Sequence, residues 1–523
     1  MPLFKDPITP KITKAAIEVG GEIFESKDHE GAIKKAEQHD MDTEFIDKEK
    51  DGLFKTSDHR LIDREQAKDE FGITHSHQIE KQKSMTLFPG REKPMMIIVT
   101  KDYSGLGWAE ICIAEGYPCI LVTNMDEDEE HDQEYDLAGL EIVPKMTMQD
   151  FMVNRKKFKH SYIFWDGNHS PEEGEILHKE GFKVLGGTQF TFDLENDRKF
   201  GTDVAKKSGA TPPETFEFSD KEAGMAFLDE NQDKAYVFKP DEGAGSYTTY
   251  VPDAYKARKG NRELYDYLEC QDGETGSFIL QERKDGIEVN IEYWVYKGQP
   301  FFAHANFECK RKENHDEGEM VGCAQDVEFK VPIDCKLAKE TVAKLLKLPE
   351  FKDYTGFMDM NIIISENKYY FLEYCCRPGY NSTPNLIMSL SLLPFPELII
   401  KWIDGDVKDF DKNFRDGFGA SVCLRIQHPK KGFPLFVDKD AKFYHFDAYK
   451  KNDKHYLAGY SNEVGIICGH EFTIQRAGEK VIREADKINF PMHACRTDLD
   501  RTDYESSPIL RFQACEAMRL FLP

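Results

Sequence analysis

The 523-residue sequence lacks any run of about 18 apolar residues, the length needed for a membrane-spanning helix. Its first segment, Met1 to Lys14, also lacks the apolar core of a signal peptide. None of the 12 cysteines has CxxC spacing, and only Cys375 and Cys376 are adjacent. Because adjacent cysteines seldom bridge each other, we expect reduced thiols. These absences predict a soluble, cytoplasmic protein with no membrane partner.

The chain also has fewer positive than negative charges. It carries 69 Lys and Arg against 95 Asp and Glu, a net charge of −26, and no basic run. Such a charge repels the phosphates of nucleic acid, so nucleic acid is not an expected partner. Apolar residues nonetheless make up 40% of the chain, with 37 Phe and 22 Tyr, which is enough for packed cores. At this length we expect roughly three or four domains.

The composition of the sequence changes near Pro94. Residues 1–90 are polar and dense in charge, which indicates an appended module or arm of unknown role. After Pro94, apolar runs alternate with helical stretches, a pattern that favours a parallel sheet. The expected elements are a strand at Met95 to Thr100, a helix at Trp108 to Gly116, and strands at Cys119 to Thr123, Tyr162 to Trp165 and Phe182 to Leu185.

An apolar strand, Tyr236 to Phe238, is closed by Lys239 and followed by a loop of small residues that includes Gly243, Gly245 and Ser246. A lysine beside such a loop can bind a polyphosphate, because glycines let backbone N–H groups approach the oxygens. Taken alone, the pattern also fits a surface lysine before a flexible turn. A charge at the end of an apolar strand is costly unless it meets an anion, which favours the phosphate site.

A second apolar strand, Tyr369 to Leu372, ends in Glu373, and Arg377 follows four residues later. Magnesium prefers hard oxygen ligands, and Asn361, on the partner strand of a predicted hairpin, adds a second oxygen. Arg377 can neutralise a transferring phosphoryl group. The alternative is a structural ion pair between Glu373 and Arg377. Cys375 carries a soft ligand that suits magnesium poorly.

Two weaker signals accompany these strands. Glu288 begins an alternating strand whose polar residues share one face, a pattern that any exposed sheet also shows. Arg198 lies at a helix start, where it can reach a phosphate, although surface helices commonly carry arginine as well. The strand Phe278 to Gln281 and the strand Glu288 to Tyr296 are expected to form a hairpin.

Six separated motifs occur in an order that resembles the ATP-grasp ligases, and within them phosphoribosylamine–glycine ligase. The resemblance runs from about residue 95 to residue 515 and includes the tail. The motifs are Val184 to Gly187; Leu194-Glu195 with Arg198 and Phe200; the Lys239 strand; Gln281-Glu282 through Glu288; Lys310-Arg311 with Gly318 and Gly322; and Glu373 with Arg377 and Gly379. The tail adds Gly432 to Pro434, Ala477-Gly478 and Arg496 to Leu499.

The resemblance implies a mixed α/β and α+β ATP-grasp fold with a Rossmann-like first domain. The expected division is a 1–90 extension, a 91–192 pre-ATP-grasp domain, a 193–300 lid region, a 301–405 metal-binding region and a 406–523 β-rich C-terminal domain. The implied reaction uses ATP with magnesium, or manganese in its place, to phosphorylate a carboxylate, and a small-molecule amine then displaces the phosphate.

The resemblance also implies roles for individual residues. Lys239 and Arg377 are the catalytic candidates. The nucleotide would contact Arg198, Lys239, Gly243, Gly245, Ser246, Gln281, Glu282 and Glu288. The metal candidates are Glu373 and Asn361, and the substrate candidates are Lys310, Arg311 and Gly379.

Three segments depart from the family pattern. Cys375 stands where the family has asparagine, Glu317 to Cys323 replaces a glycine-rich segment, and Lys101 to Gly107 replaces a glycine-rich first loop. All three lie where the family binds its substrates. Two alternatives therefore stay open: a nucleotide-binding relative with impaired catalysis, and an ATP-grasp ligase that joins an amino acid or peptide to an amine.

Overall fold

A computed structural model describes residues 93–523 except 102, 124–136, 241–248, 253–256, 272–275 and 429. Before residue 93 it describes four strands, which form an antiparallel sheet in the order β2-β1-β3-β4. These strands are β1 (Ile12–Val19), β2 (Glu22–Ser26), β3 (Leu53–Thr56) and β4 (Leu61–Ile62). The rest of the 1–90 extension lies outside the described residues, and its role stays a prediction.

A five-stranded parallel sheet follows, as the alternation of strands and helices predicts, in the order β7-β6-β5-β8-β9. Alternate residues of β5 pack into two different cores, so both faces of the sheet are covered. The strands are β5 (Met96–Thr100), β6 (Cys119–Thr123), β7 (Lys145–Thr147), β8 (Tyr162–Trp165) and β9 (Lys183–Leu185), and the helices are α4 (Leu106–Ala114), α6 (Met148–Asn154) and α7 (Pro171–Lys179), with a 3-10 turn at Arg155–Phe158.

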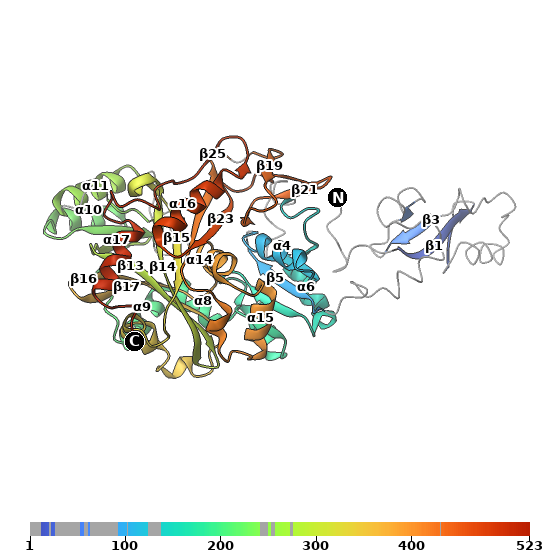
Figure 1. The fold of residues 1–523 in the computed structure, drawn as a ribbon, viewed down its shortest axis with the longest axis horizontal. Helices are drawn as coiled ribbons and strands as arrows, with labels where there is room; N and C mark the ends of the chain where they lie inside the picture. The colour runs from blue at the N-terminus through green and yellow to red at the C-terminus, as the bar shows by residue number, and fades with distance from the viewer. Residues whose placement is uncertain are drawn as a thin grey trace.

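A small lobe carries the predicted lysine strand. Its three antiparallel strands, in the order β10-β12-β11, pack on two helices around a core of their own (Figure 1). The strands are β10 (Thr215–Phe218), β11 (Tyr236–Pro240) and β12 (Phe278–Glu282); the helices are α10 (Lys221–Glu230) and α11 (Ala257–Glu269), and α8 (Gln189–Asn196) and α9 (Arg198–Lys207) lead into the lobe.

The largest element is a nine-stranded antiparallel sheet. Its strands come from both sides of residues 300 and 405, the expected boundaries of the lid, metal-binding and C-terminal regions. Its order is β17-β16-β13-β14-β15-β18-β23-β20, with β25 paired to β18. The strands are β13 (Ile287–Tyr296), β14 (Gln299–Glu313), β15 (Glu317–Lys330), β16 (Gly356–Ser365), β17 (Lys368–Cys375), β18 (Phe418–Ile426), β20 (Phe443–His445), β23 (Glu463–Glu471) and β25 (His493–Ala494).

The expected hairpin of β12 and β13 is wrong. β12 pairs with β10 and β11, whereas β13 pairs with β14 and β16, so the chain crosses from one sheet to another between them. Gly286 makes the crossing possible, because a Cβ there would lie 2.3 Å from the carbonyl oxygen of Ile364. Strand alternation predicts which face a residue occupies but not which strand lies alongside.

The remaining elements cover the central sheet and complete the C-terminal part. A four-stranded sheet has the order β21-β22-β19-β24. The elements are α12 (Lys336–Glu340), α13 (Val342–Leu345), α14 (Ser382–Asn385), the π-helical turn η5 (Leu386–Leu390), α15 (Phe395–Asp404), α16 (Ile474–Ala485), α17 (Pro508–Ala517), β19 (Pro434–Val437), β21 (Tyr449–Lys451), β22 (Lys454–Tyr456), β24 (Ile488–Asn489) and the 3-10 turns Asn314–Asp316, Pro349–Phe351 and Phe410–Asn413.

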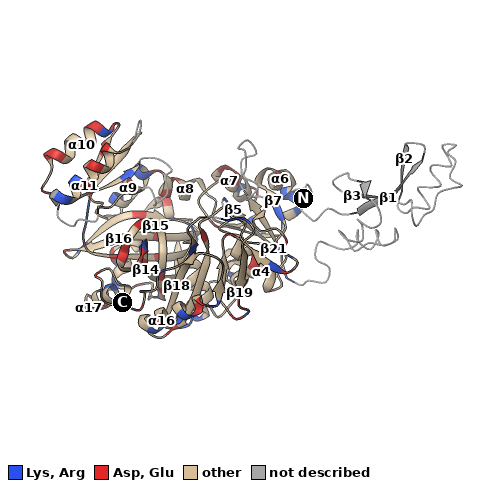
Figure 2. Ribbon diagram, turned by 90° about the horizontal axis from the view of Figure 1, so that it is seen from above, with Lys and Arg blue, Asp and Glu red and all other residues tan. Residues whose placement is uncertain are grey.

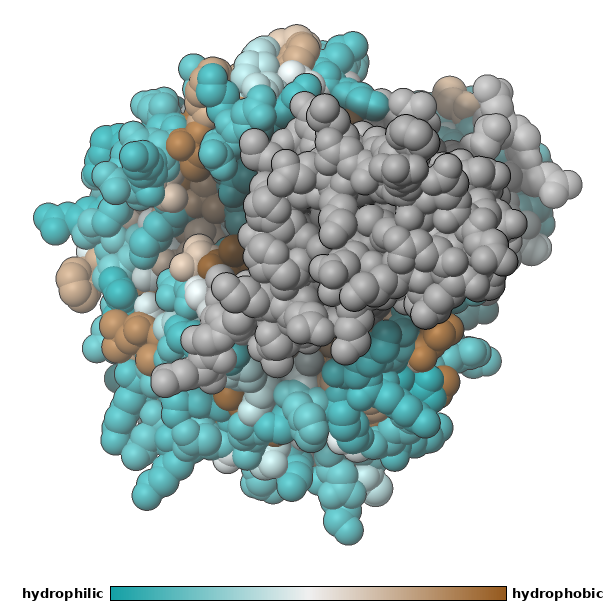
Figure 3. Space-filling model, turned by 90° about the vertical axis from the view of Figure 1, so that its right-hand side faces the viewer, coloured by the Kyte–Doolittle hydropathy of each residue, from teal (hydrophilic) through white to brown (hydrophobic). Residues whose placement is uncertain are grey.

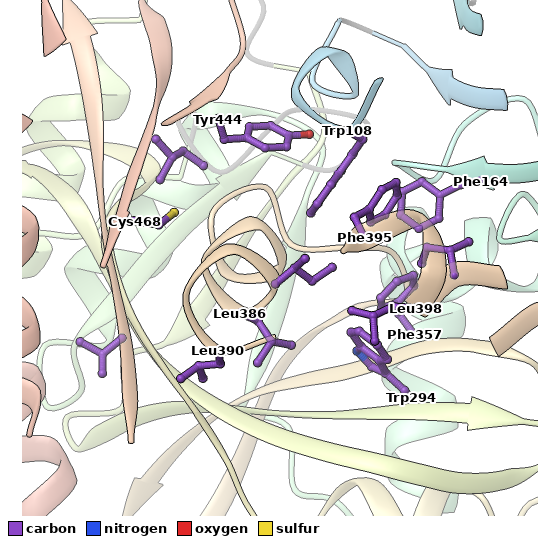
Figure 4. Close-up of a cluster of buried hydrophobic side chains, with 14 of the residues drawn as sticks. Trp108, Phe164, Trp294, Phe357, Leu386, Leu390, Phe395, Leu398, Tyr444 and Cys468 are labelled. Atoms are coloured by element: carbon purple, nitrogen blue, oxygen red, sulfur yellow. The ribbon is translucent and has the colours of Figure 1, made fainter. Parts of the chain in front are cut away.

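An aromatic cluster joins the parallel sheet to the rest of the molecule (Figure 4). Trp108 of α4 stacks on Phe395 of α15 with ring centroids 4.3 Å apart, and it meets Tyr444 of β20 edge-on. Phe164 of β8 packs against the same Phe395. Because large buried rings stabilise the contacts they make, this core holds the first domain in a fixed position against the central sheet.

The surface shows no apolar belt among the described residues. On the face drawn in Figure 3, the visible described side chains are mostly hydrophilic, and the hydrophobic ones lie in small separate groups. Exposed large hydrophobic residues, such as Val153 and Phe472, come from different elements. Within the described chain, no helix combines the length and the apolar character needed to cross a bilayer.

Candidate active site

The polar face of the central sheet is built by strand register. Glu373 of β17 lies opposite Asn361 of β16, which lies opposite Asn290 of β13, which in turn lies opposite Asn306 of β14. Directly opposed residues in a sheet point to the same face. The register therefore collects acid and amide side chains from four strands on one surface. Figure 2 shows acidic and basic residues on the neighbouring lid helices and on these strands.

Lys310 lies at the centre of this surface. Its Nζ is 2.7 Å from Oε1 of Glu288, 3.5 Å from Oε1 of Glu373 and 3.7 Å from Oε2 of Glu308. Burial lowers the pKa of Lys310, but the three carboxylates outweigh it and hold the pKa well above its ordinary value. Burial raises the pKa of Glu308, which Lys310 only partly opposes. Three carboxylates thus share one ammonium group.

Lys239, on the lid, interacts electrostatically with the same surface. The pKa of Lys239 is lowered to about 8, mainly by burial; Glu373 opposes this shift, and Arg198 and Lys310 add to it. Burial would raise the pKa of Glu373, but Lys310, Lys239 and Arg198 together bring it below its ordinary value. The structure therefore brings Lys239 and Glu373 into one electrostatic site. Within the described residues, Lys239 makes no ion pair within 4 Å.

The helix start that holds Arg198 is well defined. Asp197 caps α9, and its side chain accepts a hydrogen bond from the backbone N–H of Phe200. Arg198 is therefore the first residue of the helix, on the turn that is positive because of the helix dipole. The predicted phosphate loop residues Gly243, Gly245 and Ser246 lie outside the described residues.

The residues predicted to bind metal lie side by side. Nδ2 of Asn361 is 3.5 Å from Oε1 of Glu373 and 3.5 Å from Sγ of Cys375. Oδ1 of Asn361 is buried and has no hydrogen-bond partner among the described residues. Burial raises the pKa of the Cys375 thiol, so it stays neutral. A carboxylate with an unsatisfied amide oxygen fits a magnesium ion, which prefers hard oxygen ligands.

Arg377 does not pair with Glu373, so that alternative is wrong. Its Nε lies 3.1 Å from Oε1 of Glu195, at the end of α8, and its guanidinium lies over the ring of Tyr380, 4.5 Å from the centroid. The other oxygen of Glu195 accepts hydrogen bonds from the Cys376 backbone N–H and from the Asn168 side chain. Glu195 of α8 thus holds Arg377 in place, and the charge of Arg377 still lowers the pKa of Glu373.

Three other predicted residues lie apart from the Lys310 group. The guanidinium of Arg311 donates to the backbone oxygens of Gly318 and Val251 at 2.7 and 3.0 Å. On the lid, Gln281 donates to the Thr215 hydroxyl. Glu282 pairs with Lys284 at 2.7 Å and lies 4.0 Å from Lys234. Their assignments to substrate and nucleotide stay predictions.

Gly379 lines a small pocket beside the end of β8. The pocket contains Asp166 at the end of β8, whose Oδ2 accepts hydrogen bonds from Thr100 and Ser104 at 2.8 and 2.6 Å. Oδ1 of Asp166 is buried without a hydrogen-bond partner among the described residues. Ligands of open α/β sheets bind at such strand ends. The lining residues are Ser104, Trp108, Asp166, Pro378, Gly379, Tyr380, Pro384 and Tyr444.

A buried charge network on the same sheet was also missed. His304 of β14 contacts Glu328 with Nδ1 at 2.8 Å and Glu292 with Nε2 at 2.9 Å. Trp294 donates its indole N–H to Glu292 at 2.6 Å. Burial lowers the pKa of His304, but the two carboxylates outweigh it and raise the pKa well above its ordinary value. The alternation of these strands was visible in the sequence, but the pairing of distant strands was not.

No protein-family model matches the chain. Among curated proteins, it is 22% identical over 350 residues to phosphoribosylamine–glycine ligase of Clostridium acetobutylicum, which covers 62% of this chain and 80% of that protein. Phosphoribosylamine–glycine ligase of Thermotoga maritima superposes with a TM-score of 0.58 at 18% identity, over 77% of this chain and 99% of the other. A second structure is the biotin carboxylase domain of Hydrogenobacter thermophilus 2-oxoglutarate carboxylase, solved with MgADP, ADP and bicarbonate. It superposes with a TM-score of 0.53 at 11% identity, over 82% of this chain and 96% of the other.

These likenesses and the arrangement of lid, parallel sheet and central sheet show the fold class of the ATP-grasp proteins. Within that class, the chain resembles phosphoribosylamine–glycine ligase in sequence over most of that enzyme's length, as the order of its motifs predicted.

Proposed function

We propose that the protein is an ATP- and magnesium-dependent ligase that joins a carboxylate to an amine through an acyl phosphate. The observation that carries this proposal is the electrostatic coupling of Lys239, on the lid, with Glu373, on the central sheet. A cation from one lobe and an acid from the other can together hold a nucleotide triphosphate and its metal. The ligase relatives support the reaction class.

The positive groups of the site have distinct places around the nucleotide. Lys239 and Arg198 would contact phosphate oxygens, and Arg377 would neutralise charge on the transferring phosphoryl group. Gln281, Glu282 and Glu288 would contact the rest of the nucleotide, with Gly243, Gly245 and Ser246 at the phosphates. Such positioning and charge neutralisation account for most of the acceleration of phosphoryl transfer.

Glu373 and Asn361 would hold the magnesium ion, or manganese in its place. When bound, the ion neutralises phosphate charge and polarises the transferred group. The local charge supports this assignment, because Lys310 is the one ammonium among the described residues within 4 Å of Glu288, Glu308 and Glu373. A divalent cation would offset the remaining negative charge. Lys310 then keeps Glu288 and Glu373 in position in the absence of metal.

Gly379, Lys310 and Arg311 are proposed to contact the reacting small molecules. The pocket that Gly379 lines has room for about one water molecule as it stands, so it would have to widen to admit a substrate. Oδ1 of its Asp166 makes no hydrogen bond among the described residues and faces Nε2 of His169 at 3.7 Å, a place that an ammonium or amino group could take. Tyr380, which also lines this pocket, lies under the guanidinium of Arg377. The division into extension, first domain, lid, metal region and C-terminal domain completes the proposal.

The test is mass spectrometry of products after incubation with ATP, magnesium and a panel of amino acids and phosphoribosyl amines. The expected result is an amide formed together with ADP and phosphate, only when both an acid and an amine are present. Glu373→Gln should lower this turnover by about 100-fold or more, as when one charge-stabilising group is removed from an active site. Lys179→Met, an exposed lysine, is the matched control.

Two outcomes would overturn the proposal. Equal turnover in wild type and Glu373→Gln would remove Glu373 from the metal site. Tight ADP binding without any product from the panel, and without ATP hydrolysis that depends on an added acid, would favour the impaired relative instead.

A further inference from the structure

A second group of metal-ligating side chains lies outside the proposed active site. Glu110 of α4, His445 of β20 and His455 of β22 each present one ligand atom, and these atoms lie within 4.8 Å of one another. Oε1 of Glu110 is 3.1 Å from Nε2 of His455, and its Oε2 contacts Nδ1 of His445. The two imidazole rings stack with centroids 4.7 Å apart.

His445 supplies an independent observation. Its side chain is only 6% exposed, and neither ring nitrogen has a hydrogen-bond partner among the described residues, although Nδ1 faces Glu110. Buried polar groups in proteins are nearly always satisfied by a hydrogen bond or by another polar ligand. Nε2 of His445 is such a buried nitrogen, and no described residue satisfies it.

We propose that Glu110, His445 and His455 bind a zinc ion. Two imidazoles with one carboxylate form a ligand set that zinc uses, with a fourth position left for water. Ligand atoms about 2.1 Å from zinc lie roughly 3.4 Å apart in tetrahedral geometry, close to the Glu110–His455 separation. Magnesium and calcium prefer sets made only of oxygen, so this group is distinct from the Glu373 site in the metal it selects.

Lys450 is a positively charged neighbour that would repel a metal ion at this site. Its Nζ lies 3.3 Å from Oε1 of Glu110. The Lys450 side chain is 29% exposed, so it can turn toward solvent when a cation replaces it. Its backbone N–H donates to Leu140 of the first domain. The ion would therefore connect α4 of the first domain to two strands of the C-terminal part, at a contact that already exists.

The experiment uses the untagged full-length protein, stripped with EDTA and titrated with zinc by calorimetry in the absence of nucleotide. We expect one zinc per chain, and a tetrahedral d–d absorption spectrum when cobalt is used in its place. Glu110→Gln, close to isosteric, and His455→Ala should each weaken zinc affinity by at least about tenfold. Lys450→Met should strengthen it, and His160→Ala, on a separate surface, should leave it unchanged.

Melting curves keep the result interpretable if a variant is unstable. Zinc should raise the melting temperature of the wild type and of His160→Ala, because a ligand that binds only the folded state stabilises it. Zinc should give a smaller rise for Glu110→Gln. The proposal is overturned if the wild type binds no zinc at micromolar concentration, or if Glu110→Gln and His455→Ala bind it as tightly as the wild type does.

Discussion

The charge of Lys239 should make nucleotide binding depend on pH in a defined window. Its pKa in the free protein is about 8, because burial disfavours the ammonium. A bound polyphosphate favours the ammonium and raises that pKa. Binding is therefore strongest below pH 8 and weakens as the pH rises through the pKa of Lys239 in the free protein. Above that pKa, Lys239 must take up a proton when the nucleotide binds.

The size of the effect follows from the fraction of Lys239 that is protonated. With a pKa of about 8, only about 3% of the amines carry a proton at pH 9.5, which predicts roughly 30-fold weaker binding than at pH 7 if the lysine stays charged in the complex. The limiting slope is about one tenfold step per pH unit. The dissociation constant of MgADP, measured by calorimetry from pH 7 to 9.5, tests this.

Lys239→Arg is the matched control, because a guanidinium stays protonated over the whole range. Its affinity can differ from that of wild type at pH 7, but its dependence on pH should be nearly flat. Equal slopes in the two proteins would refute the reasoning, since another group would then be responsible. A wild type that shows no weakening up to pH 9.5 would place Lys239 away from the phosphates.

Three further predictions concern the rest of the molecule. His304→Leu leaves two buried carboxylates without their cation and should lower the free energy of unfolding by about 3–5 kcal/mol, measured by urea denaturation; an unchanged midpoint would contradict the buried network. Alkylation at pH 8 should label exposed Cys270 well before Cys375, whose thiol pKa is raised by burial, in a peptide mass-spectrometry time course; equal rates would argue against that burial. Gly174→Ala places a Cβ 1.7 Å from the Gly187 carbonyl oxygen and should cost about 1–3 kcal/mol, seen as a lower melting temperature; no loss would mean that the helix shifts freely.

The parts of the fold that are local could be predicted from the sequence. The strands Cys119–Thr123 and Tyr162–Trp165 were expected with the bounds that the structure has, because each is a short apolar run between turn residues. The hairpin of β16 and β17 was expected, and its turn residues Glu366 and Asn367 both have positive φ. The ATP-grasp order came from the family resemblance, not from periodicity.

The long-range parts of the site could not be predicted. The pair of Arg377 with Glu195 joins residues 182 positions apart, and no local pattern indicates it. Lys310 was assigned to substrate by resemblance, and its contacts with Glu288 and Glu373 depend on how three strands are ordered in one sheet. Alternation fixes the face of a residue, whereas its neighbours across the sheet follow from topology.

The unbroken run of strands from β17 to β20 has a consequence for dissecting the protein. β15 is hydrogen-bonded along Gln325 to Glu328 to β18, which lies beyond residue 405. A fragment ending there would leave those N–H and C=O groups as an open edge, a template on which another copy can add its own strand. The first part of the chain is therefore better studied with its C-terminal strands attached, since severing them would expose an edge at which copies can associate.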